Sequence, residues 1–183
     1  MWRQTRRAFT QVRDLAISPL DGRYYSKVEP LAEYFSEKAF MKYRIQTEVE
    51  WMKHLSKQNI LILNKETSRD QFSKDLEGIY SDKDFYSKVK DIEKVTNHDI
   101  KAVEYYIKEF MKERTSLSPY LEYVHFTCTS EDVNNISYAL MLRDARNKVV
   151  SPDIAKLTTT LTNLAQQTKD AKMMGRTHGQ PAT

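Results

Sequence analysis

Apolar residues recur at steps of three and four residues along most of this 183-residue chain, and this spacing most constrains its fold. The recurring residues are Met41, Ile45, Val49 and Met52; Phe85, Val89 and Ile92; Ile100, Val103, Ile107 and Phe110; Val133, Ile136 and Leu140; and Ile154, Leu157, Leu161 and Leu164. Such steps place side chains on one face of an α-helix. Because no alternating strand pattern of useful length and no internal repeat are visible, we predict an all-α fold.

Polar residues and prolines between the stripes indicate where helices begin and end. Thr96, Ser130 and Ser151 each offer a side chain that caps a helix, so we predict the three as N-caps. Asp99 completes a capping box with Thr96, and a helix of about 15 residues is expected after it. The last helix should end near Lys169, and residues 171–183 should form a loop because they contain two glycines and a proline.

Charge is uneven along the chain. The formal net charge is +4, but residues 1–13 hold four arginines and no acid, so 25 basic and 25 acidic residues remain in the rest of the chain. The body is therefore neutral and lacks the basic surface of a nucleic-acid-binding protein. Residues 1–13 have the composition of a mitochondrial targeting segment, and an ordinary extension is the alternative.

Cys128 is the only cysteine in the chain. It allows neither an internal disulfide nor a cysteine-based zinc site, and a reducing compartment fits best. No apolar run reaches the roughly 18 residues that cross a bilayer. We therefore expect a soluble protein in the cytoplasm, without membrane or nucleic-acid partners, and the mitochondrion is the alternative if residues 1–13 direct import.

Polar side chains gather at predicted helix starts and in loops. These residues are Arg23 and Tyr24; Asn97, His98 and Asp99; Thr129 and Ser130; and His178. Free backbone N–H groups at helix starts suit anionic ligands, a guanidinium suits phosphate, and an imidazole exchanges protons near neutral pH. Each group taken alone also fits a plain surface turn, a cap or a solvated histidine.

Taken together and in order, four segments resemble bacterial-type adenylosuccinate lyases. The segments are 18–24 (SPLDGRY), 96–105 (TNHDIKAVEY), 125–135 (HFTCTSEDVNN) and 176–183 (RTHGQPAT). The resemblance covers about residues 15–183 and places the chain in the fumarase and aspartase superfamily. It implies an N-terminal helical domain at 15–117 and, at 118–183, the start of the superfamily's long-helix bundle, after a basic extension at 1–14.

The resemblance also implies a reaction and a set of roles. Enzymes of this family release fumarate from adenylosuccinate, giving AMP, and from SAICAR, giving AICAR, without a cofactor and as homotetramers. Carried over by position, Arg23 and Tyr24 hold the nucleotide phosphate, Asn97, His98 and Asp99 line the pocket, Thr129 and Ser130 hold a succinyl carboxylate, and His178 is the general acid.

The family's base is a serine on a flexible loop far downstream, which these 183 residues do not include. The resemblance therefore implies that the chain alone is inactive. Two alternatives stay open at this point. One is another lyase of the superfamily, such as argininosuccinate lyase or fumarase, and the other is a helical interaction module that associates with a full-length paralogue.

Overall fold

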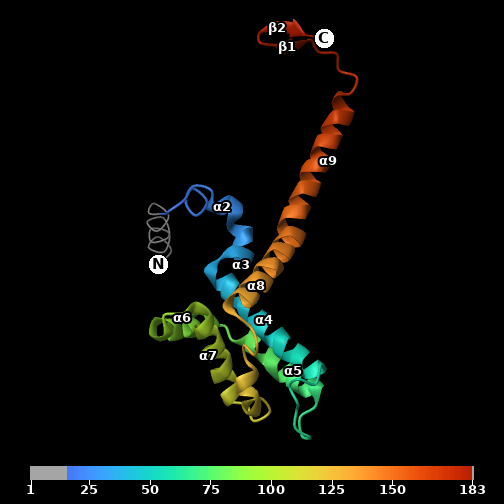
Figure 1. The fold of residues 1–183 in the computed structure, drawn as a ribbon. Coiled ribbons are helices and arrows are strands. Elements are labelled where there is room, and N and C mark those ends of the chain that lie inside the picture. Colours follow the sequence, from blue (N-terminus) through green and yellow to red (C-terminus); the bar gives the residue numbers. More distant parts are fainter. Residues whose placement is uncertain (1–15, 183) are drawn as a thin grey trace, which may run out of the picture. The chain divides into compact units, whose positions relative to one another are not determined.

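The computed structural model of this protein describes residues 16–182, which form helices and one short hairpin (Figure 1). The predicted all-α class is therefore confirmed. The basic segment 1–13, with its predicted targeting role, lies outside the described residues. None of the helices within residues 16–182 is both long and apolar enough to cross a membrane.

The chain divides into two compact units, one ending at Asp144 and the other beginning at Ala145. The predicted domains 1–14, 15–117 and 118–183 are not tested by this division and stay a prediction. The short elements of the first unit are α2 (Tyr25–Val28), η1 (Glu29–Leu31), α3 (Ala32–Phe35), η2 (Gly78–Ser81) and η3 (Ser118–Tyr123). Its longer helices are α4 (Glu37–Lys57), α5 (Arg69–Glu77), α6 (Phe85–Thr96), α7 (Asp99–Lys112) and α8 (Ser130–Ala145).

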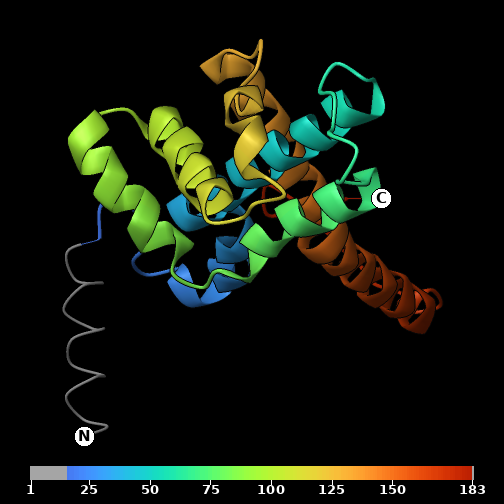
Figure 2. The same cartoon turned by 90° about the horizontal axis from the view of Figure 1, so that it is seen from below.

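Helix α4 is central to the core of the first unit. It begins after Ser36, whose hydroxyl accepts a hydrogen bond from the Ala39 N–H at 3.2 Å. Its predicted apolar stripe is buried and faces α5, α6 and α7. Figure 2 shows α6 and α7 side by side, in green and yellow-green. The helical spacing read from the sequence therefore identifies the core face of α4.

Helix α8 buries a different face from the one predicted. Its buried positions are Val133, Ser137, Met141 and Ala145, whereas Ile136 is 52% exposed. The hydroxyls of Ser137 and Thr47 lie 3.2 Å apart, so the helix contacts α4 through a polar pair as well as through apolar groups. Ser137 is polar, so the apolar pattern did not include it. The pattern therefore predicted a contact face that lies one residue before the observed one.

All three predicted N-caps are wrong by one or two residues, and two of them, Thr96 and Ser130, lie in the first unit. Thr96 is the last residue of α6, Asn97 follows in the left-handed conformation with φ 50°, and His98 caps α7. The Nδ1 of His98 accepts a hydrogen bond from the Lys101 N–H at 3.1 Å. Ser130 is the first residue of α8, so Thr129 takes the cap position.

The second unit contains the π-helical turn η4 (Arg146–Val150), α9 (Ser151–Thr168) and the strands β1 (Gly175–Thr177) and β2 (Gln180–Ala182). The end of α9 agrees with the prediction, but Ser151 is not its N-cap, because its φ and ψ of −64° and −42° are already helical. Pro152 has no N–H to bond to the carbonyl four residues earlier, and the wider turn η4 lies where that bond would form.

Residues 171–183 are not simply a loop, because β1 and β2 pair antiparallel, with Arg176 opposite Pro181. His178 and Gly179 form the turn, with φ of 49° and 76°. Positive φ at both central residues is typical of a tight two-residue hairpin. Strands of three residues are too short to give an alternating pattern in the sequence.

Candidate active site

The segment 97–99 joins α6 to α7 and exposes two side chains that the sequence predicts to bind substrate. The side chains of His98 and Asp99 are 53% and 46% exposed. Partial burial pushes the pKa of Asp99 up, but the Arg44 charge and a hydrogen bond from the Ile100 N–H outweigh it and hold that pKa below its usual range. Asp99 is therefore an ionised acceptor at the start of α7.

The start of α8 carries Thr129 and Ser130. The N–H and the hydroxyl of Thr129 donate to Oδ2 of Asp132 at 2.7 and 2.8 Å, and both bonds lower the pKa of Asp132. This pair of donors thus accommodates a carboxylate within the protein itself. The Ser130 hydroxyl has no hydrogen-bond partner among residues 16–182.

Arg23 and Tyr24 lie in the turn before α2. The N–H and hydroxyl of Ser18 donate to Oδ1 of Asp21, at 2.9 and 2.7 Å, and fix this turn. The Arg23 guanidinium lies over the exposed Tyr24 ring, 5.3 Å from its centroid. Within residues 16–182, no hydrogen bond or ion pair joins these two side chains to the other predicted site residues.

Arg44 of α4 connects two of the predicted segments. Its buried guanidinium lies 2.7 Å from Oδ2 of Asp99 and donates to Oδ1 of Asn134 on α8, at 3.0 Å from Nε and 2.9 Å from Nη2. It also stacks on the Phe40 ring at 3.8 Å. The starts of α7 and α8 are therefore held together by one charged side chain.

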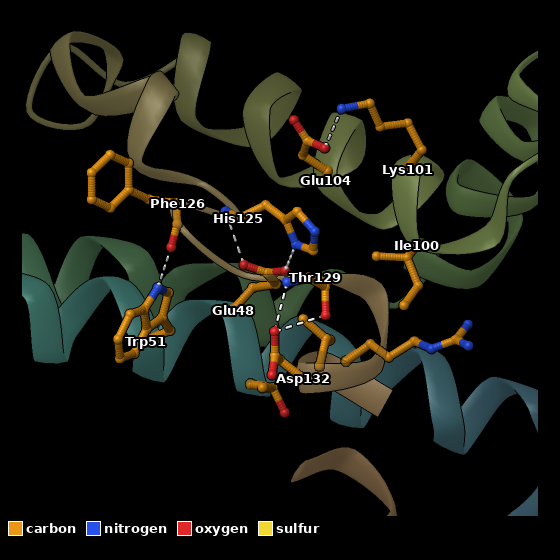
Figure 3. Close-up of polar contacts among 12 residues, drawn as sticks. Glu48, Trp51, Ile100, Lys101, Glu104, His125, Phe126, Thr129 and Asp132 are labelled. Carbon is orange, nitrogen blue, oxygen red and sulfur yellow. Dashed lines mark hydrogen bonds and ion pairs between the residues drawn. The ribbon is translucent and has the colours of Figure 1, made fainter. Parts of the chain in front are cut away.

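One turn further along α4, Glu48 holds the segment that precedes α8. Its Oε2 accepts from the backbone N–H of His125 at 3.0 Å, and its Oε1 lies 2.6 Å from Nδ1 of the same residue (Figure 3). Nearby, Nε1 of Trp51 donates to the carbonyl of Phe126 at 2.9 Å. The hydrogen bond to Glu48 raises the pKa of His125, although burial opposes this.

His178 belongs to the second unit, where it lies exposed at the hairpin turn. Its neighbours in β1 and β2 are also largely exposed. The first unit thus brings together Asp99 and the start of α8 through α4, whereas Arg23 and Tyr24 have no such connection among the described residues of that unit.

A groove of about 710 Å³ lies between α4 and α8, lined by residues such as Trp51, His54, Thr127 and Ile136. None of the predicted site residues lines it. Within residues 16–182 there is no group of three His, Cys, Asp or Glu side chains that could hold a metal ion.

Sequence reasoning missed Arg44, Glu48 and His125 as parts of this site. Arg44 and Glu48 are separated by four residues, which places two charged side chains one above the other on a helix. Their neighbours Ile45 and Val49 belong to a predicted buried stripe. Charged residues beside a core stripe were the available signal for buried, paired side chains.

Comparison with known proteins identifies the family. A family model described as "Lyase" matches residues 22–183. This chain belongs to the lyase family. The match includes every residue that the sequence places in the site, from Arg23 to His178.

The curated relatives of this lyase-family chain include adenylosuccinate lyases from distant organisms. It is 42% identical over 170 residues to that of Legionella pneumophila (strain Corby) and 43% identical over 175 residues to that of Escherichia coli (strain K12). It is 44% identical over 172 residues to that of Dictyostelium discoideum. Each comparison covers 92% of this chain and 37% of the relative, so the chain spans just over a third of the length of these proteins.

Proposed function

We propose that the protein containing this sequence is an adenylosuccinate lyase, which releases fumarate from adenylosuccinate and from SAICAR. The support is the identity of 42–44% to three proteins of that name, together with the lyase-family match over residues 22–183. Because the chain spans 37% of these relatives, the activity is proposed for the whole protein.

The reaction is a β-elimination. A base removes a proton beside a carboxylate, the carbon–nitrogen bond breaks as fumarate forms, and an acid protonates the departing nitrogen. We assign the acid to His178, because segment 176–183 resembles the family segment that carries the general acid, and the turn before Gly179 leaves this residue exposed. The base is not among the residues assigned here.

The remaining assignments concern anionic parts of the substrate. Thr129 and Ser130 are proposed to hold a carboxylate, and the bonds from Thr129 to the Asp132 carboxylate support this chemistry. A bound carboxylate would have to displace Asp132 or use the Ser130 hydroxyl. Asn97, His98 and Asp99 are proposed to line the pocket, and Arg23 with Tyr24 to bind the phosphate.

The proposed assembly is a homotetramer in the cytoplasm, with the mitochondrion as alternative if residues 1–13 direct import. Helix α9 supports self-association, because its apolar residues are more than half exposed. These residues are Ile154, Leu157, Leu161 and Leu164, at 54–59%. An amphipathic helix in a globular protein buries such a stripe against a partner.

The test is to isolate the endogenous polypeptide with an antibody against residues 15–183, measure its intact mass, and assay it with adenylosuccinate and SAICAR. We expect a mass well above 21.5 kDa and release of fumarate from both substrates. Turnover of argininosuccinate or malate instead would identify another lyase. A polypeptide near 21.5 kDa that co-purifies with an intact lyase and releases no fumarate would favour the interaction module.

A further inference from the structure

Glu48 is a buried carboxylate that has no assigned role in the proposed reaction. It is 2% exposed and lies on α4, outside every segment that carries the family resemblance. A carboxylate in a protein interior is costly unless it is paired and hydrogen-bonded. Both of its oxygens are directed at one residue, His125.

We propose that Glu48 is a positioning residue for His125, which keeps the proton of the neutral imidazole on Nδ1 and leaves Nε2 to contact the substrate. The catalytic part of this inference rests on the proposed lyase function, whereas the effect on the imidazole does not.

The tautomer follows from the donors and acceptors. A backbone N–H can only donate, so Oε2 of Glu48 must accept from the N–H of His125. Oε1 lies 2.6 Å from Nδ1, and because an ionised carboxylate can only accept, Nδ1 must carry the hydrogen. Nε2 then has a lone pair in the neutral ring and an N–H in the cation. Among residues 16–182, Nε2 has no hydrogen-bond partner.

Glu48 also holds the backbone from which the ring projects. His125 has a φ of 61°, in the left-handed region, and Thr127 has a φ of 59°. A residue with a β-carbon pays roughly 1–2 kcal/mol for this conformation, so a bond from its N–H to a fixed acceptor helps to maintain it. The same segment leads into Thr129 and Ser130.

The charges around His125 come from three helices. Glu48 of α4, Glu104 of α7 and Asp132 of α8 are acidic, and Lys101 of α7 is basic. Lys101 is paired with Glu104 at 2.7 Å, as Figure 3 shows. The acids favour the imidazolium, so Nε2 can donate to an anionic group of the substrate when the ring is protonated.

The first experiment is nitrogen NMR of the full 183-residue chain labelled in histidine. In the wild type we expect the neutral His125 to carry its proton on Nδ1. In Glu48→Gln, the amide oxygen must face the backbone N–H, so the NH₂ group faces Nδ1 and the proton moves to Nε2. The proton affinity of His125 should fall roughly tenfold to a thousandfold, the effect of removing an adjacent opposite charge.

The matched control is Glu50→Gln, on the same helix, because the Glu50 side chain is 51% exposed and pairs with Lys53. It should leave His125 unchanged. A neutral wild-type ring with its proton on Nε2 would refute the proposal, and this result does not depend on whether the variant folds. A Glu48→Gln spectrum identical to that of the control would refute it equally.

The second experiment places Glu48→Gln in the gene of the whole protein and follows kcat/KM for fumarate release against pH. If Glu48 has a positioning role, the limb of the pH profile that depends on the protonation of His125 should shift. That shift should correspond to the change in the proton affinity of His125 that NMR measures. A uniform loss at every pH would mean that Glu48 is merely structural. If the wild-type protein releases no fumarate, the proposed function fails, and the NMR result alone decides whether Glu48 controls the imidazole.

Discussion

Replacing Arg44 by methionine should weaken the first unit measurably, because the guanidinium joins three segments. Its two bonds to Asn134 are charge-assisted and together contribute about 1.5–3 kcal/mol. The pair with Asp99 adds less than about 1 kcal/mol, since that carboxylate is half exposed. Stacking on Phe40 adds about 0.5–1 kcal/mol, part of which methionine retains. We expect a loss of about 3 kcal/mol in the free energy of unfolding.

The assay is urea unfolding followed by Trp51 fluorescence in a Trp2→Phe background, which removes the other tryptophan of the chain. Trp51 lies on α4 and is hydrogen-bonded to the carbonyl of Phe126. The matched control is Lys94→Met, which removes an exposed pair with Asp91 and should change the free energy of unfolding by no more than about 0.5 kcal/mol.

A double-mutant cycle isolates the contact itself. Arg44→Met, Asn134→Ala and the double variant are compared, so that the bond from Asn134 to Glu131 cancels between the two arms. We expect a coupling energy of at least about 1 kcal/mol. Additivity within about 0.3 kcal/mol would refute the view that Arg44 fixes α8 to the start of α7.

Three further predictions concern local features. The His125 pKa is raised in the folded state, so its ion pair with Glu48 stabilises the fold fully below the ordinary value of 6.5, and this contribution is lost as pH rises through the folded-state pKa. The free energy of unfolding measured against pH should show this fall, by up to about 1.4 kcal/mol per pH unit. Glu48→Gln should abolish or reverse it. Asn97→Ala should cost about 1 kcal/mol in urea unfolding and Asn97→Gly less, because φ is 50° there. Gly175→Ala should disrupt the hairpin in backbone NMR spectra, since its β-carbon would lie 2.9 Å from the Ala182 carbonyl oxygen, whereas an alanine at exposed Ser26 should not.

Apolar spacing identified helices well because steps of three and four residues place side chains on one helix face. The stripe from Met41 to Met52 is buried as predicted, and so are Ile100, Val103 and Ile107 of α7. It failed on α8, where Ser137 is fully buried because its hydroxyl bonds to the Val133 carbonyl and contacts Thr47. Hydropathy cannot anticipate a polar residue whose partners come from the fold.

Helix boundaries were less predictable because several neighbouring residues could cap. Thr96, Asn97, His98 and Asp99 all have suitable side chains or conformations, and the structure uses Asn97 to end α6 and His98 to begin α7. Which residue takes which role depends on where the two helices pack, and no local pattern contains that information.

In the candidate site, the residues proposed to bind substrate differ in burial from the residues that hold their segments, and the motifs alone do not show this difference. The residues proposed to meet substrate in the first unit lie at helix ends and are at least partly exposed, whereas Arg44 and Glu48, which hold their segments, are buried. Exposed side chains such as Tyr24 can therefore be replaced with small effects on stability, so their loss tests chemistry. Loss of a buried charge leaves its partner unsatisfied and changes both stability and geometry. Only a readout specific to the partner, such as the tautomer of His125, separates the two effects.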